Sequence, residues 1–133
     1  MNNHDLFQKA NINKTPEFLE EYDYYIEKSA YGKLNKLKLL ALLDMLSEAK
    51  SISDLCKSDN FEKLTGTSMS LYAMKIKTKD NLRIIFSYDK DGSILLLMFA
   101  EKKGKRRTDY SGAIPKAISR LNTFIGGTHG KKG

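Results

Sequence analysis

Three basic side chains interrupt two strand-like apolar patterns in LYAMKIKTKDNLRIIFSYDKDGS, residues 71–93. Apolar residues alternate around Lys75, Lys77 and Arg83, as expected for strands that bury one face. Like charges on paired strands destabilise a sheet by several tenths of a kcal/mol per pair, about 0.2–1. An anionic ligand such as a phosphate group would explain the cations, and the alternative is a solvated sheet face with projecting lysines.

Strand register decides whether these cations meet. The apolar sets of the two strands share a face only if paired residue numbers add up to an even number. Pairing of Ile76 with Leu82 or Ile84 meets this condition and requires an odd-length loop or a bulge around TKDN. The same register places the three cations together on the opposite face.

A second basic segment follows the third strand pattern. EKKGKRRTDYSGAIPKAISRL, residues 101–121, places Tyr110 just before the last helical pattern. Its five early cations are Lys102, Lys103, Lys105, Arg106 and Arg107. Residues 71–133 carry 14 basic and 5 acidic residues, whereas residues 1–70 carry 9 and 11. The uneven charge favours a phosphate backbone or an acidic protein as partner, with a solvated lysine-rich surface as the alternative.

Two helices are expected before the sheet. Thr15 and Pro16 form a helix start, with Thr15 as the N-cap and Pro16 at the first helical position. A break at Tyr31 and Gly32 separates this helix from a second one over residues 33 to about 50. The two helices form a hairpin, and Ser51 begins a short helical turn.

The sheet and the last helix complete the predicted fold. Runs at 71–77, 82–88 and 93–102, with the Asp91-Gly92 turn, predict a small antiparallel meander in sequential order. An apolar stripe over 114–125 predicts a closing helix. We therefore expect an α+β fold with one domain over residues 1–125 and a disordered glycine-rich tail over residues 126–133.

Composition indicates an expected cellular location and argues against a metal or cofactor site. The single cysteine, Cys56, cannot form an internal disulfide, and the longest apolar run, residues 37–46, is too short to span a membrane. No secretory signal is recognisable, so a cytoplasmic location is expected. Cys56, His4 and His129 do not form a metal-ligand spacing, and no cofactor-binding motif is present. We expect neither a metal nor a cofactor.

Several of these motifs resemble one known family. KIK at 75–77, Arg83 in NLRIIFSYD, and GKRRTDY at 104–110 before a short helix are similar to the RelE/HigB toxins of bacterial type II toxin-antitoxin modules. INKTPEFLEEY and EKLTGTSMSLY resemble the phage-type HigB branch of the RelE/ParE superfamily. The similarity runs from about residue 12 to residue 121.

The resemblance implies a RelE/ParE-like fold and an mRNA interferase, a ribosome-dependent endoribonuclease that an antitoxin silences. Its implied partners are mRNA, the ribosome and the cognate antitoxin. The residues that match the family's catalytic set are Lys75, Lys77, Arg83, Arg106 and Tyr110. Lys102, Lys103, Lys105 and Arg107 would contact RNA or the ribosome. A histidine near the site, frequent in HigB-type enzymes, has no counterpart, because His129 lies in the tail.

Metal-independent cleavage by 2′-hydroxyl attack requires a base, an acid and fixed cations. Without a histidine in the site, tyrosine and lysine must move the protons, and nearby cations favour both the phenolate and the neutral amine. We expect Tyr110 or Lys77 as the base and Lys75 as an aid to proton transfer. Arg83 and Arg106 would clamp the phosphate.

Two other functions stay open. A ParE-like inhibitor of DNA gyrase would share the fold without nuclease activity, and an RNA-binding module or decayed toxin would bind without cleaving. Tyr110 separates a nuclease from a plain binder, because only catalysis needs its hydroxyl. The antitoxin is expected to present an acidic or amphipathic segment to the basic half of the chain.

Overall fold

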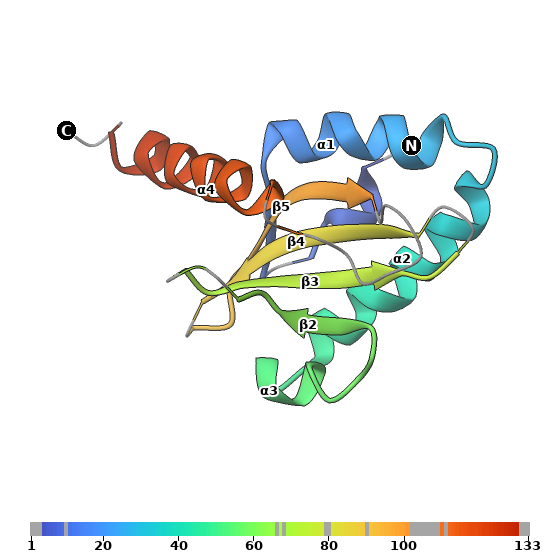
Figure 1. The fold of residues 1–133 in the computed structure, drawn as a ribbon, viewed down its shortest axis with the longest axis horizontal. Coiled ribbons are helices and arrows are strands. Elements are labelled where there is room, and N and C mark those ends of the chain that lie inside the picture. Colours follow the sequence, from blue (N-terminus) through green and yellow to red (C-terminus); the bar gives the residue numbers. More distant parts are fainter. Residues whose placement is uncertain are drawn as a thin grey trace.

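A computed structural model describes residues 4–9, 11–65, 67, 69–78, 81–89, 91–101, 110 and 112–130. Its centre is a five-stranded mixed sheet of order β1-β5-β4-β3-β2 (Figure 1). The strands are β1 (Ile12–Lys14), β2 (Phe61–Lys63), β3 (Leu71–Ile76), β4 (Leu82–Tyr88) and β5 (Ile94–Glu101). The expected α+β class is therefore correct.

The predicted meander forms the middle of the sheet. β3, β4 and β5 pair antiparallel in sequential order. Ile76 lies opposite Leu82, and Lys75 lies opposite Arg83, so the even-sum register is confirmed. The connection between β3 and β4 spans residues 77–81, an odd number, and Asn81 in it has a φ of 48°.

The purely antiparallel sheet predicted from the sequence is wrong in extent and in type. β1 adds to β5 in parallel, which makes the sheet mixed, and β2 adds to β3 antiparallel at the other edge. Each added strand has only three residues. Such a length is too short for period-2 alternation to stand out, and long-range pairing selects these strands instead.

The helical hairpin lies where the sequence predicts it. The Thr15 Oγ1 accepts the Phe18 N–H at 3.1 Å and caps α1 (Pro16–Tyr22), which continues as the π-helical segment η2 (Asp23–Glu27). After a sharp turn, α2 runs from Gly32 to Glu48. A Cβ on Gly32 would lie 2.1 Å from the Ile26 carbonyl oxygen, so this close approach requires glycine.

Two short helices flank these elements. The 3₁₀ helix η1 (Asp5–Phe7) precedes β1, and α3 (Ile52–Leu55) follows α2. The Ser51 Oγ accepts the Asp54 N–H at 3.2 Å, which confirms the predicted helical turn. The last helix, α4, spans Ala113–Gly130 and so extends five residues past residue 125, the predicted end of the folded domain.

A β-bulge in β5 provides a backbone carbonyl that binds side chains from α4 and from the N-cap of α1. The register between β4 and β5 shifts between Ile85 and Phe86, which leaves Leu97 unpaired. The Leu97 carbonyl accepts from Thr15 Oγ1 at 3.3 Å and from Arg120 Nη1 at 2.9 Å. Arg120 also forms a bidentate ion pair with Glu21, at 2.9 and 2.8 Å, which joins α4 to α1.

The two faces of the sheet bury separate apolar clusters. We call the face packed against α1, η2 and α2 the hairpin face and the opposite one the α4 face. The hairpin face carries most of the large buried side chains, including Phe18, Tyr22, Leu39 and Phe86. The α4 face has a smaller cluster, in which Ala117 and Leu121 of α4 pack on Ile85 and Leu97. β5 is covered on both faces, as its continuous apolar run predicts.

Candidate functional site

Lys75 and Arg83 lie directly opposite each other on the α4 face, near the ends of β3 and β4. The predicted clustering of these two cations is therefore correct. Arg83 is only 6% exposed. Its Nη1 donates to the Leu82 carbonyl at 3.2 Å, while its buried Nε has no hydrogen-bond partner among the residues that the structure describes. A buried, unsatisfied guanidinium N–H costs about 1–3 kcal/mol or more, so the fold gains no stability from this atom.

A carboxylate that the sequence analysis did not single out completes the cluster. Glu62, in β2, lies opposite Ala73 and projects on the same face as Lys75. Its Oε1 is 3.8 Å from the Lys75 Nζ and accepts the Tyr110 hydroxyl at 2.9 Å. Glu62, Lys75, Arg83 and Tyr110 are called the polar cluster below.

The start of α4 positions Tyr110. Its carbonyl accepts the N–H groups of Ala113 at 3.0 Å and Ile114 at 2.9 Å, so the tyrosine is fixed to the first helical turn. Its ring packs against the apolar cluster of the α4 face. The phenol therefore reaches the sheet from a separate element, at a set distance from Glu62.

For the other predicted site residues, the described part of the chain shows no contact with the polar cluster. Lys77 follows the last residue of β3 and is exposed. Arg106, expected to clamp a phosphate, lies outside the described residues. So do the four expected RNA or ribosome contacts, Lys102, Lys103, Lys105 and Arg107. Their roles stay predictions.

The N-terminal histidine has a defined place, far in sequence from these residues. The His4 Nε2 is 2.9 Å from an Asp23 carboxylate oxygen, and the His4 ring makes an edge contact with Tyr22. Burial, aided by the Glu62 charge, raises the pKa of the Cys56 thiol. Cys56 packs beside the hairpin-face cluster, as expected of a small apolar side chain.

The described residues form neither a metal-ligand group nor a membrane-spanning helix. Among the described residues, no group of three or more His, Cys, Asp and Glu side chains is arranged to hold a metal ion. In the same part of the chain, no helix combines the length and apolar character needed to cross a membrane. The expected cytoplasmic location stays a prediction.

The polar cluster combines the groups that phosphate chemistry uses. Arg83 and Lys75 supply positive charge, and the Tyr110 phenol and Glu62 carboxylate can exchange a proton through their hydrogen bond. Sequence reasoning missed Glu62 because β2 is too short to be recognised. Its one signal is the FEK triplet, which precedes the expected loop and whose middle residue is acidic.

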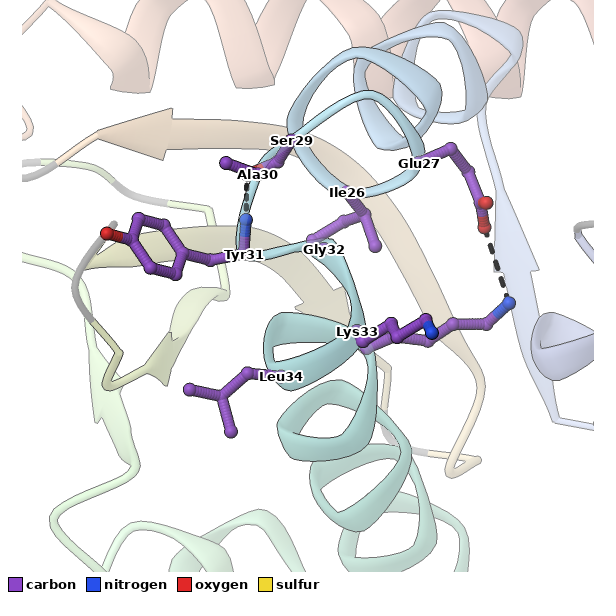
Figure 2. Close-up of a pocket in the computed structure, with 9 residues that line it drawn as sticks. Ile26, Glu27, Ser29, Ala30, Tyr31, Gly32, Lys33 and Leu34 are labelled. Carbon is purple, nitrogen blue, oxygen red and sulfur yellow. Dashed lines mark hydrogen bonds and ion pairs between the residues drawn. The ribbon is translucent and has the colours of Figure 1, made fainter.

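A hollow of about 630 Å³ lies at a different place, the turn between η2 and α2. Figure 2 shows Tyr31 and Leu34 on one side of this turn and Glu27 on the other. The Glu27 carboxylate forms an ion pair with Lys36. That pair is 3.3 Å long, and the Tyr31 N–H donates to Ser29 Oγ at 3.2 Å. The hollow belongs to the hairpin, whereas the polar cluster lies on the α4 face.

Comparison with known proteins does not identify a family for this chain. No protein-family model matches the chain, and a search of curated proteins found no match. The family resemblance thus rests on the sequence motifs between residues 12 and 121 alone, and it stays a prediction.

Proposed function

We propose that this chain is the toxin of a type II toxin-antitoxin module, a RelE/HigB-like endoribonuclease that cleaves mRNA on the ribosome without a metal ion. The proposal includes a RelE/ParE-like fold, with the hairpin, the meander and the closing helix as its common parts. The observation that carries it is Arg83, a buried cation opposite Lys75 whose Nε finds no hydrogen-bond partner in the described part of the chain. A phosphate oxygen is the acceptor that such a pair is suited to bind.

The proposed reaction uses these side chains in separate roles. A base takes the proton of the ribose 2′-hydroxyl, and the 2′-oxygen then attacks the adjacent phosphorus. The bond to the 5′-oxygen then breaks, that oxygen takes up a proton, and a 2′,3′-cyclic phosphate remains. Arg83, with Arg106, would hold the phosphate charge, and Lys75 would assist proton transfer.

Glu62 extends the set of possible bases. The Tyr110 hydroxyl already donates to Glu62 at 2.9 Å, so a phenolate formed at Tyr110 requires its proton to pass to a neighbour such as this carboxylate. Alternatively, Glu62 accepts the 2′-hydroxyl proton itself and Tyr110 only orients it. Tyr110, Lys77 and Glu62 are therefore the candidate bases.

Brief expression in bacteria tests the proposal. Messenger 5′ ends are mapped after induction of the chain, of Tyr110→Phe, and of Tyr24→Phe as a matched control. Tyr24 is 66% exposed and lies in η2, away from the polar cluster. We expect new cuts within translated regions for the chain and the control, and a loss of about 10²-fold or more for Tyr110→Phe.

Other results would point elsewhere. Growth arrest with intact messages would contradict the nuclease proposal and indicate a ParE-like action on DNA gyrase. Cleavage that is equal in Tyr110→Phe would remove the phenol from the mechanism. Loss of cleavage in the Tyr24→Phe control as well would mean that folding, not chemistry, was lost.

An acidic antitoxin is part of the same proposal. The net charge of +9 over residues 71–133 supports an acidic or amphipathic partner segment. The product of the neighbouring gene should form a complex that survives moderate salt and that stops cleavage. No stable complex with that product would count against the toxin assignment.

A further inference from the structure

Helix α2 has two apolar stripes, although a surface helix needs only one. Its inner stripe is buried against the sheet, with Leu39, Leu42, Leu43 and Leu46 at 0–5% exposure. On the outer side, Leu34, Leu37 and Met45 are exposed by 49%, 65% and 37%. With the exposed Ala41 they recur at spacings of three and four residues, so they share one face of the helix.

No described part of the chain covers this outer stripe. Leu34 also borders the hollow at the η2–α2 turn, where Tyr31 is 43% exposed (Figure 2). The stripe and the hollow edge thus form a continuous apolar surface along α2. Contiguous apolar surface of this kind usually marks an interaction site in a folded protein.

Charge along α2 indicates which partner fits. The exposed basic residues, Lys33 and Lys38, lie in its N-terminal half, and the exposed acidic residues, Asp44 and Glu48, lie in its C-terminal half. A second α2 packed antiparallel brings each basic half against an acidic half and opposes the two helix dipoles. A uniformly acidic or basic partner would match only one half.

We infer that this chain forms a two-fold symmetric dimer through antiparallel packing of α2 on α2, with Ala41 at the crossing point. The small Ala41 side chain lets the helices approach, and Leu34, Leu37 and Met45 pack on both sides of it. Lys33 then lies level with Glu48 of the other copy, because both are seven or eight residues from Ala41.

The proposed interface leaves the polar cluster open. α2 packs on the hairpin face, whereas Lys75, Arg83 and Tyr110 lie on the α4 face. A dimer therefore presents two such clusters on its outer sides. The inference does not depend on the nuclease, because assembly is measured without any RNA.

Sedimentation of the purified chain from about 1 to about 100 µM tests the dimer. We expect the dimer fraction to rise with concentration. For Leu37→Glu, the affinity of dimerisation should fall by at least about tenfold. Lys33→Glu and Glu48→Lys should each weaken the dimer, and the double variant should recover it. A monomer at every concentration, or a double variant weaker than both single variants, would overturn the proposal.

Cross-linking places the two-fold axis. In a Cys56→Ser background, Ala41→Cys should form a disulfide-linked dimer under mild oxidation, because helices in contact bring facing Cα atoms within disulfide range. Glu20→Cys, exposed on α1, is the matched control. Equal cross-linking of both cysteines, or a dimer unaffected by Leu37→Glu, would show that another surface associates.

Discussion

The two faces of the sheet differ in what their side chains do. On the hairpin face, α1, η2 and α2 cover stacked and edge-packed rings, such as Phe18 against Phe99 with centroids 5.0 Å apart. On the α4 face, one helix covers a smaller cluster, and the sheet end beside it carries Lys75, Arg83 and Glu62. The comparison indicates that one face supplies most of the stability while the other can carry the chemistry.

The largest expected effect compares one leucine from each face. Leu39→Ala on the hairpin face removes a side chain with 0% exposure and should lower the free energy of unfolding by about 3–5 kcal/mol. Leu121→Ala on the α4 face, at 8% exposure, should cost about 2 kcal/mol. Urea denaturation measures both. Equal losses would mean that the two faces contribute alike.

Arg120→Gln breaks the link between the faces. The change removes the bidentate ion pair with Glu21 and a hydrogen bond to the Leu97 carbonyl. We therefore expect the free energy of unfolding to fall by about 2 kcal/mol. Hydrogen exchange should rise in α4 before it rises in α1. Lys116→Gln, exposed on the same helix, should change stability by less than about 0.5 kcal/mol. Unchanged exchange in α4 would show that apolar packing alone holds it.

The buried phenol of the hairpin face gives a pH test. Burial, with a 2.7 Å hydrogen bond to Glu27, raises the pKa of Tyr22 far above its ordinary value of about 10. Its stabilising effect is complete below about pH 10 and is lost above it, by up to about 1.4 kcal/mol per pH unit. The difference in stability between the chain and Tyr22→Phe should shrink from pH 9 to about pH 11. A constant difference would contradict this.

The smallest effect is expected at the β4–β5 turn, at the end of the sheet opposite the polar cluster. Gly92 has a φ of +88°, so Gly92→Ala should cost about 1 kcal/mol. Gly112→Ala meets no atom within 4 Å and should be close to neutral. RNA cleavage should be unaffected by either change. Lost cleavage in stably folded Gly92→Ala would extend the functional region beyond the cluster.

The sequence predicts those features that strong local patterns specify. The Thr15 cap, the register of Lys75 with Arg83, the Asp91-Gly92 turn and the closing helix are all confirmed. Each follows from a side chain that bonds its own backbone or from an alternation long enough to be unambiguous. Two members of the polar cluster, Lys75 and Arg83, were placed together by this means.

The missed features depend on contacts between distant parts of the chain. β1 and β2 are three-residue strands that exist because β5 and β3 offer free edges, and Glu62 joins the site through β2. The hydrogen bond from Tyr110 to Glu62 spans 48 positions. The outer stripe of α2 was also missed, because a dense apolar run does not show which of its residues the rest of the fold leaves uncovered.

Arg83→Met is the measurement that tests the central claim most directly. If Arg83 is kept for phosphate binding, replacing it with an apolar side chain of similar size should raise the free energy of unfolding by about 1 kcal/mol or more, because the unsatisfied Nε is removed. Cleavage should fall by about 10²-fold or more. Lys63→Met, exposed on β2, should change neither quantity. A less stable Arg83→Met protein with undiminished cleavage would contradict the account, because Arg83 would then hold the fold together and not the substrate.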